Sequence, residues 1–475
     1  MNTWSEMIAA RDPDARAVVD HDGTWTVAEL QRRAAGAADW LDEAGFAAGR
    51  PVPALLGTTK DAFALLLGAA ATDRPLAPLG PRLSPPEIAS CLTGLGADRL
   101  VTAPAYRDAA ERAAALAGCE AVVLPSPPVS DRELPSPAAD ATAFILHTSG
   151  TSGVPKAAWA RQDRMAARAS VNAGLLELGP TTVYTTASPF HHIAGLGMLA
   201  VGLASESALA CFPEFSVDAW RGLEPLGVTH ALLVPTMVEI LLAAGALDIG
   251  TLRLLVYGGA PMHPDTLRRT LAELPDVRFL QIFGQTEGSP ICFLGPGAHQ
   301  EAAAGRVELL RSVGRPAPGV TLRVHEPDED GEGELQARAE HFFRTETDGW
   351  LHTGDLGRIA EDGYVYLLGR RGDMIIRGGE NVHPVEVEQV ISQHPGVREV
   401  AVLGVPDQRL GQTVHAVVVP ADPAAPPSDE ELRAHVRAQL SGFKTPSSWS
   451  FVGALPRNQQ GKLLRRVLVE QHQDA

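Results

Sequence analysis

The sequence contains few cysteines, and their spacing argues against two classes of protein. Only four occur in 475 residues, at Cys91, Cys119, Cys211 and Cys292. They form neither a CxxC pair nor a Cys/His spacing of the kind that binds zinc, so neither a disulfide framework nor a structural zinc site is expected. Reduced, buried thiols in a cytoplasmic protein are the expectation that remains.

Basic charge and long apolar runs are also scarce. The 40 basic and 57 acidic residues give a net charge of −17, which argues against a nucleic-acid or anionic-membrane partner. The N-terminus lacks the basic and apolar regions of a signal peptide. No apolar run reaches the roughly 20 residues of a membrane span. The stretch Gly195–Ala204 is short and interrupted by glycine, and it predicts a buried core helix.

Helical and strand patterns alternate along the chain, which predicts an α/β fold. Ala28–Ala44 has a helical apolar period, whereas Ala231–Val234 is typical of a buried strand. A chain of 475 residues with 45% hydrophobic residues is expected to form two or more domains.

The last hundred residues carry a pattern of their own. Strands are predicted at Val400–Val405 and Val414–Val419. Ser428 and Glu431 form a capping box for a helix that is expected to run to Leu440. This segment therefore predicts a small α+β domain.

A loop rich in Ser, Thr and Gly follows the predicted strand Ala143–Leu146. Its glycines, hydroxyls and lysine are suited to binding phosphates. It lacks the GxxxxGK[ST] pattern, because a proline precedes the lysine and no Ser or Thr follows it. Alone, the loop fits a surface turn equally well. The candidate phosphate ligands are Thr148, Ser149, Gly150, Thr151, Ser152, Gly153 and Lys156.

Four further motifs follow this loop in a fixed order. They are Phe283–Glu287, His352–Asp355, Gly369–Asn381 and Pro456–Lys462. With the loop, they resemble the adenylate-forming superfamily of acyl-CoA synthetases, peptide-synthetase adenylation domains and luciferases. Aryl- and acyl-CoA ligases are the most similar members. Five motifs in order are a far more specific signal than any one of them.

The resemblance implies an ATP site. Thr286 would bind the α-phosphate as a catalytic residue, Glu287 would hold Mg²⁺, and Phe283 would stack on adenine. Asp355, together with Arg370, would bind the ribose. The implied ATP and AMP contacts are Thr148, Ser149, Gly150, Thr151, Ser152, Gly153, Lys156, Gly258, Gly259, Ala260, Phe283, Gly284, Asp355 and Arg370.

Lys462 is implied to be the catalytic lysine. Attack of a carboxylate on the α-phosphorus brings two anions together, and a lysine that bridges them offsets the repulsion. Without the resemblance, Lys462 would be one cation of a solvated basic tail.

The resemblance also implies two domains. A large N-terminal α/β domain of several subdomains (1–368) would bind ATP and acid. A hinge (369–373, with Gly372) would connect it to a small, mobile α+β domain (374–475). Rotation about the hinge would remove Lys462 and bring Gly378 and Gly379 over the site as a thiol tunnel.

The segment Pro189–Gly195 resembles the part of the family beside the acyl pocket. His192 would be a catalytic gate, although packing roles for both neighbouring histidines remain an alternative. The segment has no aspartate for a substrate amine, so an apolar or aromatic acid without an α-amine is expected. The candidate pocket residues are His192, Gly195, Met198, Val234, Gly288 and Ser289.

Three functions remain in competition. The first is an AMP-forming acyl-CoA synthetase that uses ATP, Mg²⁺ and CoA. The second retains adenylation but passes the acyl group to a carrier protein or another nucleophile. The third is a non-catalytic nucleotide-binding relative. A homodimer is expected from the resemblance alone. Ala157 and Gly372 differ from the residues that the family usually has at these positions. These differences bear on the prediction of thioester formation more than on that of adenylation.

Overall fold

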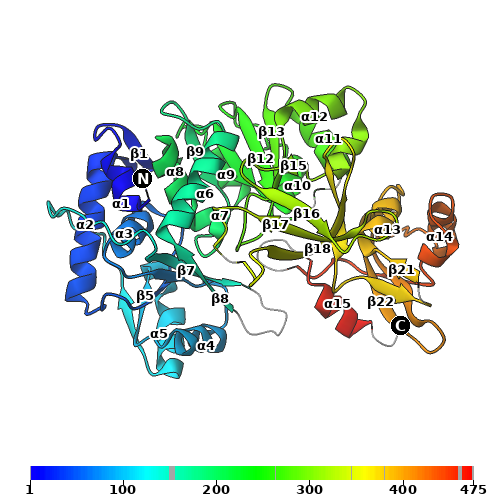
Figure 1. Ribbon diagram of the computed structural model, residues 1–475, viewed down its shortest axis with the longest axis horizontal. Helices are drawn as coiled ribbons and strands as arrows, with labels where there is room; N and C mark the ends of the chain where they lie inside the picture. The colour runs from blue at the N-terminus through cyan, green and yellow to red at the C-terminus, as the bar shows by residue number, and fades with distance from the viewer. Residues whose placement is uncertain are drawn as a thin grey trace. The chain divides into compact units, whose positions relative to one another are not determined.

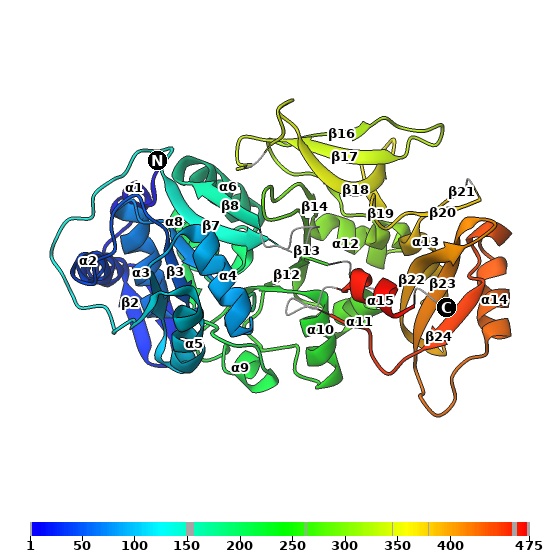
Figure 2. The ribbon, with the colours of Figure 1, turned by 90° about the horizontal axis from the view of Figure 1, so that it is seen from below.

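The computed structural model describes residues 2–148, 156–260, 262, 264–343, 345–378, 380–457 and 463–472. It divides into two compact units. The first comprises residues 1–310, 316–321 and 338–351, and the second comprises 311–315, 322–337 and 352–475. Figures 1 and 2 show the elements of each unit from two directions.

The first unit contains two largely parallel sheets. In the first sheet, β7 and β8 are antiparallel and the other neighbours are parallel. Its strands, in spatial order, are β6 (Glu120–Val123), β5 (Arg99–Thr102), β3 (Val52–Leu55), β4 (Leu76–Pro78), β7 (Thr142–Thr148) and β8 (Lys156–Arg161).

The second sheet is parallel in its centre and antiparallel at both ends. Its order includes β14 (Cys292–Leu294), β13 (Arg278–Phe283), β12 (Leu254–Gly258), β11 (His230–Leu233), β9 (Val183–Thr186), β10 (Ala208–Ala210), β1 (Arg16–Asp20) and β2 (Gly23–Thr26). The short strand β15 (Arg315–Pro316) comes later, where the chain passes between the units.

Helices cover both sheets, and one layer is shared. Helix α3 (Lys60–Ala71) contacts β7 of the first sheet and β1 of the second, so it belongs to the middle layer. The other helices are α1 (Trp4–Ala9), α2 (Val27–Glu43), α4 (Pro85–Leu95), α5 (Arg107–Ala117), α6 (Gln162–Leu175), α7 (Ile193–Leu196), α8 (Met198–Ser205), α9 (Val217–Arg221), α10 (Pro235–Ala243), α11 (Pro264–Glu273) and α12 (Pro296–Ala303).

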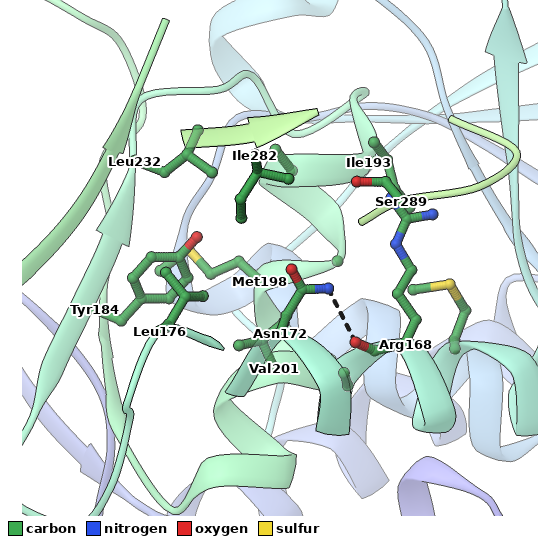
Figure 3. A pocket seen from close by; sticks show the side chains of 14 residues that line it. Arg168, Asn172, Leu176, Tyr184, Ile193, Met198, Val201, Leu232, Ile282 and Ser289 are labelled. Atoms are coloured by element: carbon green, nitrogen blue, oxygen red, sulfur yellow. Dashed lines mark hydrogen bonds between the residues drawn. The ribbon is translucent and has the colours of Figure 1, made fainter. Parts of the chain in front are cut away.

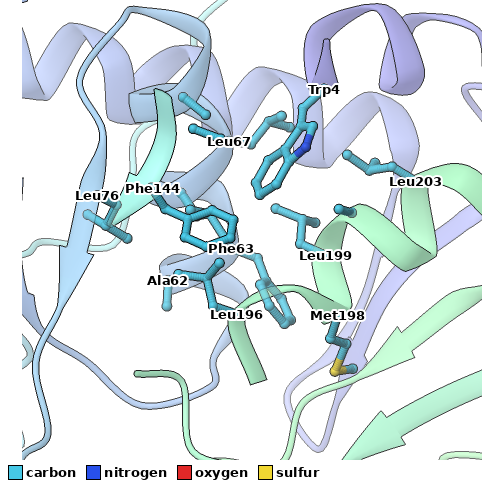
Figure 4. Close-up of a cluster of buried hydrophobic side chains, with 14 of the residues drawn as sticks. Trp4, Ala62, Phe63, Leu67, Leu76, Phe144, Leu196, Met198, Leu199 and Leu203 are labelled. Carbon is cyan, nitrogen blue, oxygen red and sulfur yellow. The ribbon is translucent and has the colours of Figure 1, made fainter. Parts of the chain in front are cut away.

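The main core lies in this middle layer (Figure 4). The Trp4 and Phe144 rings pack 5.9 Å apart, and those of Phe63 and Phe190 pack 6.1 Å apart. Gly68 lets α3 approach α2, because a Cβ added there would lie 2.2 Å from the carbonyl oxygen of Ala34. Helices α2 and α3 are therefore held together by close backbone contact as well as by side chains.

The second unit contains two further sheets. One is antiparallel at β18–β19 and has the order β16 (Thr321–His325), β17 (Gly333–Arg338), β18 (Leu351–Ile359) and β19 (Val365–Arg370). The other has the order β21 (Glu380–Val382), β20 (Ile375–Arg377), β23 (Gly411–Pro420) and β22 (Val397–Asp407), with β24 (Ser448–Phe451) paired to β23. The helices of this unit are α13 (Pro384–Ile391), α14 (Asp429–Arg437) and α15 (Arg465–Gln471).

The mixed α/β fold class is confirmed. The compact units do not divide at residue 368, however, because residues 322–337 and 352–368 group with the C-terminal part. Strands β16 to β19 form one sheet that groups mainly with the C-terminal part, whereas residues 338–351, where the chain runs from β17 to β18, group with the first unit. The expected hinge at 369–373 remains a prediction.

Several local predictions agree with the structure, with small differences in their bounds. The predicted helix Ala28–Ala44 is α2, and the capping box of Ser428 and Glu431 begins α14. Helix α14 ends at Arg437 rather than Leu440. The predicted core helix near Gly195 is two short buried helices, α7 and α8. No helix in the described part of the chain is long and apolar enough to cross a membrane.

Candidate active site

A small cavity lies in the first unit between helix α6, helices α7 and α8, and the second sheet (Figure 3). Its volume is about 90 Å³. Most of its wall is apolar, and four side chains bring polar atoms to it: Arg168, Asn172, Tyr184 and Ser289. The described lining residues are Met165, Arg168, Ala169, Asn172, Leu176, Tyr184, Ile193, Ala194, Gly197, Met198, Val201, Leu232, Ile282 and Ser289.

Arg168 is the charged residue of this cavity. Arg168 is 5% exposed, and burial lowers its pKa from 12.5 to about 9. The negative charge of Glu287 offsets part of this shift. Arg168 Nη1 donates a hydrogen bond of 3.0 Å to the carbonyl oxygen of Thr286. The guanidinium also lies 5.8 Å from the centre of the Phe343 ring. One side chain therefore links the cavity to the Thr286–Glu287 segment.

Two of the six residues expected at the acyl pocket, Met198 and Ser289, line this cavity. The other four, His192, Gly195, Val234 and Gly288, are not among its described lining residues. Gly195 packs on backbone, since an added Cβ would lie 2.2 Å from Pro189 O. A Cβ on Gly288 would meet Leu351 at 2.4 Å. Their acyl-pocket roles remain predictions.

Thr286 and Glu287 lie in a tight turn after strand β13. Gln285 and Gly288 exchange backbone hydrogen bonds of 2.8 and 3.1 Å across it, and Phe343 N donates to Glu287 O at 3.1 Å. Within the described residues, no basic nitrogen lies within 4.0 Å of the Glu287 carboxylate. Its oxygens are therefore suited to a metal ion that prefers oxygen ligands.

Gly258 and Gly259 end the neighbouring strand β12. Gly258 is the register partner of Ile282 on β13, and an added Cβ would lie 2.4 Å from Ile282 O. Gly259 has a φ of +79°, which favours glycine. The two strands thus bring the glycines and the Phe283–Glu287 motif to the same edge of the sheet, with Ala260 directly after the glycines.

The predicted phosphate loop follows β7 and precedes β8. The register pairs Thr148 with Lys156 and His147 with Ala157. Ser149, Gly150, Thr151, Ser152 and Gly153 lie outside the described residues, as do the side chains of Thr148 and Lys156. The hairpin nevertheless fixes the two ends of the loop opposite each other.

His191 and His192 lie immediately before α7. Their ring centres are 4.0 Å apart, and His191 Nδ1 is buried without a hydrogen-bond partner among the described residues. Burial lowers the pKa of His191 to about 4, with a further contribution from Arg82. Burial, with a contribution from His191, lowers the pKa of His192 to about 3. Both rings are therefore neutral at neutral pH.

This burial predicts acid sensitivity. Below an unfolded-state pKa of about 6.5, the unfolded chain gains protons that the folded protein does not, so the free energy of unfolding falls as pH falls. Each such histidine contributes a slope of up to about 1.4 kcal/mol per pH unit. We expect His191→Gln to flatten the decline of unfolding free energy between pH 6.5 and 4, measured by denaturant titration. His21→Gln at an exposed position should leave it unchanged, and equal slopes in all three proteins would contradict the assignment.

Asp355 and Arg370 are described within the second unit. They are register partners on β18 and β19, and Arg370 Nε lies 2.7 Å from Asp355 Oδ1. Asp355 is 8% exposed. The predicted ribose ligands therefore adjoin each other, and their sheet positions explain why residues 15 apart in the sequence meet.

The residues expected to serve the second half-reaction are only partly described. A Cβ added to Gly372 would meet no other atom within 4 Å. Gly378 has a φ of +61° and donates a backbone hydrogen bond of 2.8 Å to Leu410 O. Gly379 and Lys462 lie outside the described residues. Their roles remain predictions.

Sequence reasoning missed Arg168 and Asn172. A signal was present, because Met165, Arg168, Asn172 and Leu176 follow one another at helical spacings of three and four residues. The first three positions and the C-cap residue Leu176 therefore share one face of α6, and that face lines the cavity.

Two family models match the chain. The model described as AMP-binding enzyme matches residues 5–345, and the model described as AMP-binding enzyme C-terminal domain matches residues 386–462.

Relatives match along almost the whole length. A fatty acid–[acyl-carrier-protein] ligase, ScoC, from Streptomyces coeruleorubidus is 33% identical over 97% of this chain and 94% of its own. A feruloyl-CoA synthase from an Amycolatopsis species is 33% identical over 98% of this chain and 97% of its own. The crystal structure of ATP-bound MatB from Rhodopseudomonas palustris has a TM-score of 0.88 and 29% identity, and covers 100% of this chain and 99% of that one.

Proposed function

The chain belongs to the AMP-binding enzyme family, and we propose that it activates a small carboxylic acid as an acyl-adenylate at the cavity beside Thr286 and Glu287. The single observation that carries this proposal is Arg168, which lines the cavity and also bonds the Thr286 carbonyl oxygen. An acid in the cavity would thus adjoin the segment expected to bind the α-phosphate.

The reaction proceeds in two steps. The carboxylate attacks the α-phosphorus of ATP, forms a carboxyl–phosphate bond and releases pyrophosphate. A thiol then attacks the acyl carbon and releases AMP. Adenylation is needed because the oxide of a free carboxylate is a poor leaving group, whereas AMP is a good one. The enzyme is thus an AMP-forming acid–thiol ligase.

Each nucleotide contact has a physical role. The Thr286 hydroxyl donates to an α-phosphate oxygen, and Phe283 stacks on adenine. Asp355 accepts from the ribose hydroxyls with Arg370 beside it, and their 2.7 Å contact holds the carboxylate in one orientation. Lys156 binds the departing phosphates.

Magnesium is assigned to Glu287. No group of three or more His, Cys, Asp or Glu side chains in the described residues is arranged to hold a metal. A single carboxylate fits Mg²⁺, which is usually bound by one or two carboxylates together with substrate phosphates and water. The ion would neutralise phosphate charge during adenylation.

CoA is the proposed thiol, with Gly378 and Gly379 forming its tunnel. A carrier-protein pantetheine is the second candidate acceptor, and one relative is named as a carrier-protein ligase. A cytoplasmic location and a homodimer complete the proposal.

The acid should lack an α-amine, because no described carboxylate lines the cavity and Arg168 would repel an ammonium group.

The proposal is tested by ATP–pyrophosphate exchange with a panel of short mono- and dicarboxylic acids, followed by mass spectrometry for thioesters after CoA is added. We expect exchange that depends on both acid and Mg²⁺, and a thioester with the same acids. Nucleotide binding without exchange for any acid would instead support a non-catalytic relative. Adenylation without CoA transfer would favour a carrier protein.

A further inference from the structure

Arg168 is a buried cation that has no carboxylate partner in the described part of the chain. No described carboxylate oxygen lies within 4.0 Å of its guanidinium, which carries five N–H donors. The described residues provide it with one acceptor, Thr286 O. Burying a charge is costly unless it is paired and hydrogen-bonded. Glu287 offsets part of this cost through its negative charge but forms no ion pair with Arg168, so the remaining donors indicate an anion that arrives with the ligand.

The neighbours of Arg168 do not supply that anion. Phe343 presents a ring, Met165 and Ile193 are apolar, and Asn172 donates its side-chain amide to Arg168 O at 2.9 Å. Figure 3 shows the Arg168 side chain extending along the cavity toward Ser289 and Ile193. The guanidinium thus lies where a bound acid would meet it.

The reacting carboxylate is a poor candidate for this partner. Adenylation converts it to a neutral mixed anhydride carbonyl, so a cation paired with it would stabilise the substrate more than the product of the first step. Such ground-state stabilisation slows the reaction. A second acidic group keeps its charge through both half-reactions and is bound equally throughout.

We propose that Arg168 is a specificity-determining residue that binds a second acidic group, so that the preferred substrates are short acids with a carboxylate or sulfonate at the far end. This rests on the proposed adenylation. It differs from the expectation of an apolar or aromatic acid, and it keeps the expectation that the acid lacks an α-amine. The cavity of about 90 Å³ favours a short spacer over a long acyl chain.

The test compares matched acids. Succinate is paired with butyrate, glutarate with valerate, and terephthalate with 4-methylbenzoate, so that a methyl group replaces the second carboxylate. We expect the wild type to prefer at least one dicarboxylate by about 100-fold in kcat/KM for pyrophosphate exchange, because the monocarboxylate leaves the buried guanidinium without its charged partner. Arg168→Met should abolish or reverse that ratio.

Two further variants separate specificity from structure. Arg168→Lys keeps the charge and should retain part of the dicarboxylate preference. Arg164→Met removes the same residue type from the same helix, one turn away and outside the cavity, and should leave the ratio unchanged. The ratio is measured within each protein, so partial unfolding does not alter it.

Three outcomes are distinguishable. Exchange with monocarboxylates alone in the wild type would overturn the role of Arg168 and leave adenylation intact. Equal loss for both members of each pair in Arg168→Met would also overturn it and would assign Arg168 to positioning the Thr286 carbonyl. Exchange with no acid at all would overturn the proposed function itself.

Discussion

Replacing Lys462 with alanine is expected to abolish acyl-adenylate formation while largely sparing thioester formation from a supplied acyl-adenylate. Lys462 lies outside the described residues, so this prediction rests on its motif and on charge. In the proposed reaction the lysine would offset repulsion between the carboxylate and the α-phosphate as the new bond forms. Removing such a preorganised donor typically raises the barrier by about 2.7–4 kcal/mol, or about 10²–10³ in rate.

The second half-reaction has no such need. The thiol attacks the acyl carbon, and the charge that develops leaves with AMP. Pyrophosphate exchange reports the first step, and AMP release from a synthetic acyl-adenylate plus CoA reports the second. Arg466→Ala removes a nearby cation that is bonded to Glu470 on the surface of α15, and it should spare both steps. Equal loss of both steps in Lys462→Ala would refute the assignment.

Gly258→Ala should cause the second large loss, in both stability and activity. The added Cβ would lie 2.4 Å from Ile282 O, a backbone atom, so β12 and β13 must move apart. Overpacking of this kind costs about 1–3 kcal/mol. Ile282 lines the cavity, and Phe283 to Glu287 follow it directly, so the shift reaches the proposed site.

Gly94→Ala, on helix α4 and outside the proposed site, is the matched control for this change. Its Cβ would meet nothing within 4 Å, and its φ lies outside the left-handed range. A glycine-to-alanine change in such a position raises stability by about 0.4–1 kcal/mol through the unfolded chain. Thermal unfolding and pyrophosphate exchange measure both variants. If Gly258→Ala proved as stable and active as Gly94→Ala, the close strand contact would not be essential.

The sequence predicts local elements well where one pattern determines them. The apolar period of α2 begins at a capping box that holds both Thr26 and Glu29, and the structure contains both bonds. Strands β11 and β12 read as continuous apolar runs because helices cover both faces of a parallel sheet. The motifs also identify the turn at Thr286 and the pair of Asp355 and Arg370.

Long-range packing limited the rest of the prediction. Arg168 lies in an alanine-rich helix, where an arginine normally faces water, and its acceptor is 118 residues away. Gly195 is a candidate pocket residue by its motif, but the sequence does not show that the backbone of Pro189 fills the space where its Cβ would lie. The sheet of β16 to β19 is assembled from two separated stretches of chain, so no compositional change marks its boundary.

The pairing of Thr148 with Lys156 has an entropic consequence for nucleotide binding. Joining the two ends of a loop restricts the chain, but here the hairpin of β7 and β8 imposes that restriction when the protein folds. Binding of ATP phosphates therefore carries no separate entropy loss for bringing the ends together. Loop-closure entropy also grows slowly with length, by about 0.6 kcal/mol per doubling. The segment between the strands can thus vary in length with little effect on the free energy of folding, so its sequence can be determined by the phosphates that it is proposed to bind.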